Sequence, residues 1–268
     1  MAGRVYREWP PPPELRRPVF CLWADERPSD SPGTGLVLPD ACMDLVWDGR
    51  EVSVAGPDTG PVTVERPPRA AFVGLRFRPG QAPPVLGLPS DALRDQRVGL
   101  AELWDGDEVD RLTERLAAAP TAEEAAAHLA AAVQRRRRMA GADEADPLVG
   151  GLVAWLGTAP ASAGVVATAA EALGVGVRQL HRRCEDGVGY GPKMLERVLR
   201  FRRAQQLVER GAGLAAAAAG AGYADQPHMN RDFRRLTGRS PAELLLSGPP
   251  VSEPAVSDPF KTGPGPGS

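Results

Sequence analysis

The sequence predicts an α+β protein of two domains: a β-rich, barrel-like N-terminal domain with a helical hairpin, and an all-α C-terminal domain with two helix-turn-helix units. The chain of 268 residues is long enough for two ordinary domains. In the first 145 residues, short apolar runs alternate with turn residues, which is typical of strands. From Pro147 onward, apolar residues recur at helical spacing. One pattern in this second half occurs twice, which indicates a duplicated unit.

Short apolar segments predict the sheet of the N-terminal domain. Residues 19–24 are apolar at every position, which predicts a strand buried on both faces. Residues 43–47 and 52–55 flank Asp48-Gly49, and Asp-Gly between such runs favours a hairpin. Residues 71–77 predict a further strand. No helical spacing precedes residue 90 or so, and the domain is therefore expected to be mostly β.

Helical spacing follows the predicted sheet. Residues 108–116 and 122–139 predict a helical hairpin packed on the barrel. Acidic and small residues at 141–146 then predict a linker. The two domains are accordingly expected at residues 1–140 and 147–248.

The end of the chain, residues 249–268, is rich in Pro, Gly and Ser. This composition predicts a disordered tail.

The second half repeats one pattern at a spacing of 49 residues. The first copy is Leu180, Arg182, Cys184, Gly189, Pro192 and Leu195, and the second is Met229, Arg231, Phe233, Gly238, Pro241 and Leu244. In each copy, two apolar residues four positions apart lie on the buried side of a helix, with the Arg facing outward. Ala-rich helices are expected upstream of the copies, at residues 165–173 and 214–221, and a joining helix at 192–209. Each copy is therefore predicted to be a helix-turn-helix unit.

Two runs carry this repeat: LGVGVRQLHRRCEDGVGYGPKMLERVLRFRRA at residues 173–204 and GYADQPHMNRDFRRLTGRSPAEL at residues 222–244. Together they resemble the DNA-binding domain of AraC/XylS-type transcription regulators. The phrases LPDACMDLVW, VAGPDTGP and VGLRFRPG of the first half resemble an N-terminal domain of undescribed function that precedes this unit in a group of AraC-like regulators. The resemblance implies a sequence-specific transcription regulator with two recognition helices in successive major grooves. It also implies that the N-terminal half senses a ligand or pairs subunits and so modulates the protein.

Outward side chains near the N-terminus of each second helix are the ones that reach base edges. The predicted base-contacting residues are Arg178, His181, Arg182, Gln226, Asn230 and Arg231. Arg pairs with guanine, whereas Gln and Asn suit adenine. Asp225 is the expected N-cap of the second recognition helix. The simpler alternative is that these are merely exposed polar residues of two helices.

Further basic residues are expected on the DNA backbone. The predicted phosphate-contacting residues are Arg183, Lys193, Arg197, Arg200 and Arg203. Residues 147–247 hold 13 Lys and Arg against 8 Asp and Glu, a formal charge of +5, so the remainder carries −7. The joining helix would span about 27 Å, close to one DNA turn of about 34 Å. The run Arg135–Arg138 is interpreted as a solvated helix end, with a phosphate contact as the alternative.

Three features depart from the family pattern. Gly176 stands where a Ser usually caps the recognition helix, and Cys184 replaces a usual Phe. Residues 214–221 are nearly all Ala, and Gly220 among them costs about 1 kcal/mol against Ala. The second unit is therefore expected to be loosely folded until it meets DNA, and specificity is expected to depend more on the first.

No enzymatic activity, metal or cofactor is predicted. The chain has three His and three Cys, and no metal-ligand cluster can be assembled from them in the β domain. No P-loop, nucleophile-elbow or dinucleotide motif occurs. The enzyme alternative is a DNA-alkylation repair or response protein with Cys21 or Cys42 as a reactive thiol. A non-regulatory DNA-bending protein is a third reading, and it would discriminate little between sequences.

The expected partner is double-stranded DNA. RNA polymerase, an unidentified small-molecule effector and a second copy of the chain in a homodimer are further candidates. Without paired Cys spacing, a long apolar run or a signal peptide, the chain is expected to be cytoplasmic and not to enter a membrane.

Overall fold

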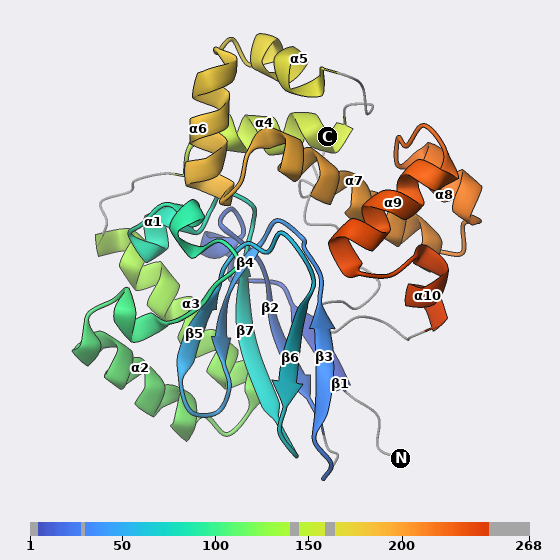
Figure 1. Ribbon diagram of the computed structural model, residues 1–268. Helices are drawn as coiled ribbons and strands as arrows, with labels where there is room; N and C mark the ends of the chain where they lie inside the picture. The colour runs from blue at the N-terminus through green and yellow to red at the C-terminus, as the bar shows by residue number, and fades with distance from the viewer. Residues whose placement is uncertain (1–4, 28–29, 140–144, 159–163, 247–268) are drawn as a thin grey trace, which may run out of the picture.

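The computed structural model describes residues 5–27, 30–139, 145–158 and 164–246. A β-rich N-terminal domain carries helices on one side of its sheet, and a helical C-terminal domain lies across one end of that sheet (Figure 1). The predicted α+β class is confirmed. Most of the predicted linker at 141–146, and all of the predicted tail at 249–268, fall outside the described residues.

The N-terminal domain is built on antiparallel strands. They are β1 Val5–Trp9, β2 Val19–Glu26, β3 Gly33–Val37, β4 Met43–Trp47, β5 Val52–Ala55, β6 Val62–Arg66, β7 Ala71–Phe77 and β8 Arg97–Gly99. Within the described residues, six strands form one sheet in the order β1-β2-β7-β4-β5-β8, and β3 pairs with β6 as a separate ribbon. The sheet does not close into the predicted barrel, because β1 and β8 lie at opposite edges of the described sheet.

The predicted strands of the sheet are confirmed, and so is the hairpin. Trp47 of β4 faces Val52 of β5 across a turn in which Gly49 has a φ of 95°, a conformation that glycine tolerates best. Asp48 closes the turn, since its carboxylate accepts hydrogen bonds from the backbone N–H groups of Arg50 and Glu51. Strands β1, β3, β6 and β8 were not predicted, because their short segments carry too few apolar residues to form a recognisable run.

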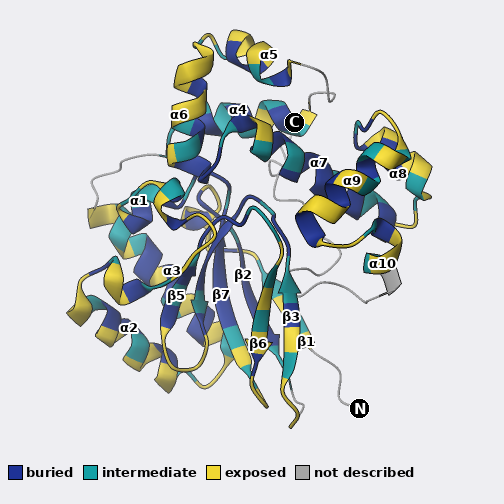
Figure 2. Ribbon diagram, viewed as in Figure 1, coloured by how far each residue is buried: buried dark blue, intermediate teal, exposed yellow. Residues whose placement is uncertain are grey.

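The two faces of the sheet have different roles, because successive side chains of a strand point to opposite sides. One face presents Leu22, Leu45 and Leu75 to the main core of the domain. The other face presents polar and aromatic side chains, including Trp23 and Arg76, toward the β3–β6 ribbon. Strands β2 and β7 are largely buried (Figure 2).

A helical hairpin covers the first face, as predicted. It consists of α2 Gly106–Ala118 and α3 Ala122–Met139, and α3 packs against β2 and β7. Shorter helical segments precede it: η1 Pro13–Leu15, α1 Pro83–Leu86, η2 Ser90–Leu93 and η3 Leu100–Glu102. Two of these segments, η1 and α1, lie before residue 90, where the sequence shows no helical spacing, because both are too short to show a helical period.

The C-terminal domain is helical throughout its described part. Its helices are α4 Pro147–Thr158, α5 Val165–Ala172, α6 Val177–Val188, α7 Pro192–Glu209, α8 Leu214–Gly220, α9 Gln226–Thr237 and α10 Pro241–Leu246. Helix pairs α5–α6 and α8–α9 form the two predicted helix-turn-helix units, and α7 joins them. Phe201 of α7 and Phe233 of α9 meet edge to face at 4.7 Å between ring centres. No helix in the described part of the chain is long and apolar enough to cross a membrane.

The two domains share a buried boundary. Leu38 and Ala41, on the loop between β3 and β4, belong to the apolar core of the C-terminal helices. The hydroxyl of Ser90 donates a hydrogen bond of 2.8 Å to the carbonyl of Gly187 in α6. Gly189, which ends α6 at a φ of 92°, lies against Pro57, and any side chain there would collide with it. The first helix-turn-helix unit is therefore fixed to the N-terminal domain at the C-terminal end of α6.

Candidate nucleic-acid interface

The first candidate recognition helix is α6, and it begins at Val177. Leu180 and Cys184 are buried, whereas Arg178 and Arg182 are exposed one turn apart. His181 is exposed and lies beside Gly191, where an added Cβ would stand 2.6 Å from the imidazole ring. The predicted division of α6 into a buried and an exposed face is confirmed.

The start of α6 has no side chain to cap it, because the N-cap is Gly176. Three free backbone N–H groups at a helix N-terminus attract anions. This end of α6 therefore suits a DNA phosphate as well as a base edge.

The second candidate recognition helix is α9. Asp225 caps it, and its carboxylate accepts a hydrogen bond of 2.6 Å from the backbone N–H of His228. Arg231 is exposed, and Gln226 and Asn230 are half-buried. Among the described residues, the Asn230 side-chain oxygen has no hydrogen-bond partner. This oxygen is buried in the structure, so Asn230 can accept a hydrogen bond from an adenine amino group only after its side chain turns outward.

Arg200 is a correction to the predicted phosphate contacts. It is only 7% exposed and is held by carboxylates on two helices: Glu196 of α7 at 2.9 Å and Asp232 of α9 at 2.7 Å. Its guanidinium also lies 4.5 Å from the centre of the Tyr223 ring. Arg200 therefore joins α7 to the second helix-turn-helix unit inside the protein and does not face DNA. The sequence could not show this, because Asp232 lies 32 residues away.

The other predicted phosphate contacts lie nearer the surface, but each already has a partner. Lys193 donates to Glu196, and Arg197 lies 3.4 Å from Asp232. Arg203 donates to the carbonyls of Leu156 and Gly157 at the end of α4, and Arg183 forms an ion pair with Asp146 before α4. A phosphate would have to compete with these internal acceptors. Lys193 is the best placed, since its side chain is 54% exposed.

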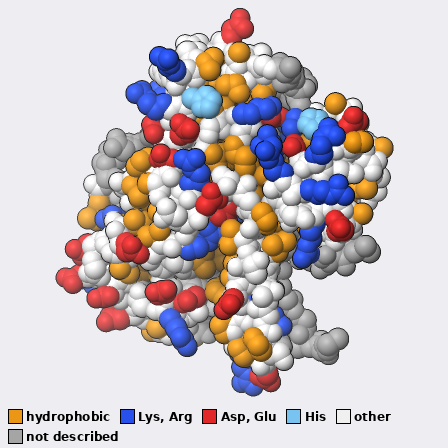
Figure 3. Space-filling model, in the orientation of Figure 1, with side chains coloured by type: hydrophobic (Ala, Val, Ile, Leu, Met, Phe, Trp, Pro, Cys, Tyr) orange, Lys and Arg blue, Asp and Glu red, His pale blue; other side chains and the backbone are white. Residues whose placement is uncertain are grey.

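One face of the molecule gathers Lys, Arg and His side chains over α6, α7 and α9 (Figure 3). Exposed basic residues of these helices include Arg178 and Arg182 of α6, Lys193 of α7, and Arg231, Arg234 and Arg235 of α9. The two candidate recognition helices thus present positive charge to the same side, as binding to one duplex requires. Arg234 and Arg235 were not among the residues selected from the sequence. Their position one turn after Arg231 on the same helix was the signal that could have identified them.

The cysteines of the alternative repair mechanism are buried and free. Burial raises the pKa of the Cys21 and Cys42 thiols well above the ordinary value, and it raises that of Cys184 to about 12. The thiolate is the reactive form of cysteine. Across the described ranges, no cluster of His, Cys, Asp and Glu side chains could hold a metal. Both observations disfavour a zinc-activated cysteine.

An arginine–aspartate cluster at the domain boundary was also missed. Arg76 of β7 contacts Asp44 of β4 at 2.9 Å and Asp40 of the β3–β4 loop at 3.4 Å. Arg202 of α7 is 3% exposed, and although burial lowers its pKa, nearby Asp40 opposes that effect. Asp40 therefore interacts with Arg76 of the sheet and with Arg202 of α7, the helix that joins the two helix-turn-helix units.

Comparison with known proteins bears on both domains. A family model described as "Helix-turn-helix domain" matches residues 169–246, and one described as "Domain of unknown function (DUF6597)" matches residues 7–99. A protein of Streptomyces antibioticus named "Putative AraC-like transcription regulator" is 36% identical over 102 residues, which cover 37% of this chain and 33% of that protein. The match therefore spans about a third of the relative's length.

The chain also shows partial similarity to solved structures. ToxT from Vibrio cholerae O395 is 9% identical, with 90% of this chain and 97% of that chain covered and a TM-score of 0.47. A "probable AraC family transcriptional regulator from Rhodopseudomonas palustris CGA009" is 22% identical, with 39% and 100% covered and a TM-score of 0.33.

Proposed function

We propose that the chain is an AraC-like transcription regulator that places α6 and α9 in successive major grooves of one duplex. The match to a helix-turn-helix family model behind a DUF6597 domain, and the similarity to a putative AraC-like regulator, support this proposal. One observation carries this proposal. Exposed basic side chains of both helices lie on one face of the molecule, while Leu180 and Cys184 of α6 and Met229 and Phe233 of α9 are packed with α7 in a common core (Figure 3).

The chemistry of the two helices suggests which bases they read. Arg178 and Arg182 of α6 are each able to donate two hydrogen bonds to guanine, whereas Asn230 of α9 suits adenine. Each good pair discriminates against a wrong base by about 1–3 kcal/mol. The preferred site should therefore contain a G-rich element for α6 and a mixed element for α9.

Modulation by the N-terminal domain has a physical route in the buried boundary. The loop that carries Leu38 and Ala41 is part of the C-terminal core, and Asp40 on the same loop contacts Arg76 of the sheet. A change in the sheet that moves Arg76 would act on this loop, and through it on α7. The proposed regulator therefore responds to events in its N-terminal domain.

Selection from a random DNA pool tests the DNA-binding part. The full-length chain is mixed with random duplexes at physiological salt, and the retained fragments are sequenced. The expected result is a site with two conserved elements one helical turn, about 10 base pairs, apart. The double variant Arg178→Ala/Arg182→Ala should lose the first element and keep the second.

The outcomes separate the alternatives. A single conserved element would mean that only one helix reads bases. Retention of DNA without any enriched sequence would favour the DNA-bending protein, since such a protein shows a small specificity ratio.

A further inference from the structure

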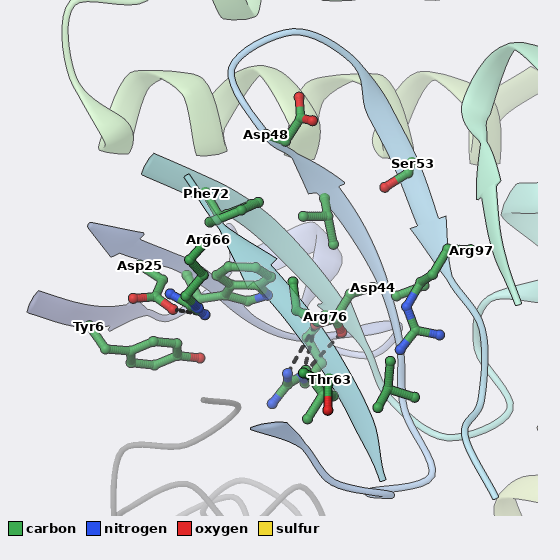
Figure 4. A pocket seen from close by; sticks show the side chains of 16 residues that line it. Tyr6, Asp25, Asp44, Asp48, Ser53, Thr63, Arg66, Phe72, Arg76 and Arg97 are labelled. Carbon is green, nitrogen blue, oxygen red and sulfur yellow. Dashed lines mark hydrogen bonds and ion pairs between the residues drawn. The ribbon is translucent and has the colours of Figure 1, made fainter. Parts of the chain in front are cut away.

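A cavity of about 330 Å³ lies between the six-stranded sheet and the β3–β6 ribbon in the described structure. Its lining is mainly apolar and comes from both layers, for example Val46 and Phe72 of the sheet and Val62 of the ribbon. Figure 4 shows Tyr6, Asp25, Arg66 and Phe72 gathered at one end, and Arg76, Asp44 and Arg97 at the other. Small-molecule sites have this size and this mixture of apolar walls with a few polar groups.

Two buried side chains at the first end have hydrogen-bond donors without acceptors. Arg66 is 5% exposed, and one terminal nitrogen meets Asp25 at 2.5 Å, but its Nε and Nη1 have no partner within the described residues. Trp23 is 8% exposed, and its indole N–H likewise has no partner in the part of the chain that the structure describes. Both line the cavity. Unpaired buried donors are rare in folded proteins, because each has lost its hydrogen bonds to water.

The two side chains are close to each other. Trp23 and Asp25 are two residues apart on β2 and so point to the same face of the sheet, and Arg66 contacts Asp25. The indole ring stacks on Tyr6 at 6.1 Å and an interplanar angle of 14°, and the Arg66 guanidinium lies 5.4 Å from the Phe72 ring centre. Each of the two side chains thus lies against an aromatic ring.

The cationic side chains around the cavity are already paired. Each arginine that lines it faces an aspartate: Arg66 faces Asp25, Arg76 faces Asp44, and Arg97 faces Asp58. A ligand anion would add an unbalanced charge to a low-dielectric site, and a ligand cation would meet Arg66. The unsatisfied groups are donors, and they require an acceptor rather than a charge.

We propose that this cavity binds an uncharged, largely apolar molecule, such as an aromatic ketone, whose carbonyl oxygen accepts hydrogen bonds from Arg66 and from the Trp23 indole N–H. The binding itself is independent of the proposed function, and only the ligand's role as an effector rests on it. Arg76 lines the same cavity and contacts Asp40 of the boundary loop. An occupant is therefore placed to influence the helical domain.

Three probes with one ring system test the ligand class. 2-Acetylnaphthalene has a neutral carbonyl, 2-ethylnaphthalene has the same shape without an acceptor, and 2-naphthoate carries a charge. Each is titrated into the full-length chain without DNA, and heat of binding is measured. The ketone should bind at least about fivefold more tightly than either analogue, which is the effect of one hydrogen bond.

Two variants locate the site. Trp23→Phe removes the indole donor and keeps an aromatic ring, and it should weaken ketone binding about fivefold. Asp25→Asn/Arg66→Met removes the other donors without leaving a lone charge, and it should have at least the same effect. Trp104→Phe is the matched control, because Trp104 is also buried with an unpartnered indole N–H in the described structure but lies outside this cavity.

The results are decisive in either direction. Equal binding of the ketone and the hydrocarbon, preference for the naphthoate, no binding of any probe, or a ketone affinity unchanged by both pocket variants would each overturn the proposal. DNA selection with the unliganded chain is a separate readout. Failure there with ketone binding intact would remove the proposed function and leave the cavity's ligand class standing.

Discussion

Arg200 is the residue whose role differs most from the expectation. Its two carboxylate partners belong to α7 and α9, so that removal of Arg200 breaks the link between these helices and leaves Glu196 and Asp232 with only the more exposed Lys193 and Arg197 as partners. Arg200→Ala should lower the free energy of unfolding by about 3–5 kcal/mol, as measured by urea denaturation of the full-length chain.

Arg210→Ala is the control for this variant, because Arg210 is exposed at the end of the same helix. It should change stability by less than about 0.5 kcal/mol. A stable Arg200→Ala protein with a flatter salt dependence of DNA binding would restore the phosphate-contact interpretation.

Burial makes the three thiols poor nucleophiles. Because the folded pKa of Cys184 is raised to about 12, and those of Cys21 and Cys42 are raised well above the ordinary value, the thiols are protonated in the folded protein at pH 8. A disulfide reagent such as 5,5′-dithiobis(2-nitrobenzoate) should therefore react with none of them in native protein over the time in which all three react in guanidinium. One fast-reacting thiol in the native chain would revive the repair alternative.

At the element scale, the two recognition helices differ in how firmly they are held. Helix α6 is supported by α4, α5, α7 and, through Ser90, by the N-terminal domain. Helix α9 packs against α7 and against α8, and the buried residues of α8 are the small Ala217 and Ala218. A firmly held helix keeps its side chains at productive distances from the bases, and a loosely held one must be ordered on binding.

Arg182→Ala should therefore weaken binding to the selected site by about 1–3 kcal/mol and relax the base preference at one base pair. Arg231→Ala should cost less, because α9 packs on the small side chains of α8 and is held less firmly than α6. Titrations of both variants on the selected site and on scrambled DNA measure the difference. If Arg182→Ala weakens both DNAs equally, Arg182 contacts a phosphate and α6 lies differently in the groove.

For the whole molecule, the shared boundary predicts coupled unfolding of the two domains. Leu38 comes from the N-terminal domain but is buried among the C-terminal helices, so that neither domain retains its full core alone. Calorimetry of the full-length chain should show one cooperative transition. Leu38→Ala should lower the free energy of unfolding by about 2–5 kcal/mol and divide this transition into two, because the variant loses packing between the domains.

Leu15→Ala is the matched control, since Leu15 is equally buried but lies wholly in the N-terminal core. It should lower the transition temperature and keep a single transition. A single transition in both variants would show that Leu38 does not couple the domains, and two transitions in the unmodified chain would show that the domains unfold independently.

Local signals account for the elements that were predicted well. The start of α6 at Val177, the bounds of α7 at Pro192 and Glu209, and the Asp225 cap of α9 depend on residues within a few positions of each other. The same holds for the exposure of Arg178, Arg182 and Arg231, because helical spacing assigns their face once Leu180, Cys184 and Met229 are buried. The sequence by itself thus determined the helical repeat and its outward residues.

Contacts between distant residues decided the rest. Strand pairing left the sheet open, with β3 and β6 as a separate ribbon over it. The position of Asp232 buried Arg200, and the fold brought Leu38 into the helical core. The donors of Trp23 and Arg66 came together through the pairing of Arg66 with Asp25, 41 positions earlier in the chain. Only the tertiary structure decides such features, because burial and ion pairing depend on which segments meet in space, and a local pattern carries no information about its distant partner.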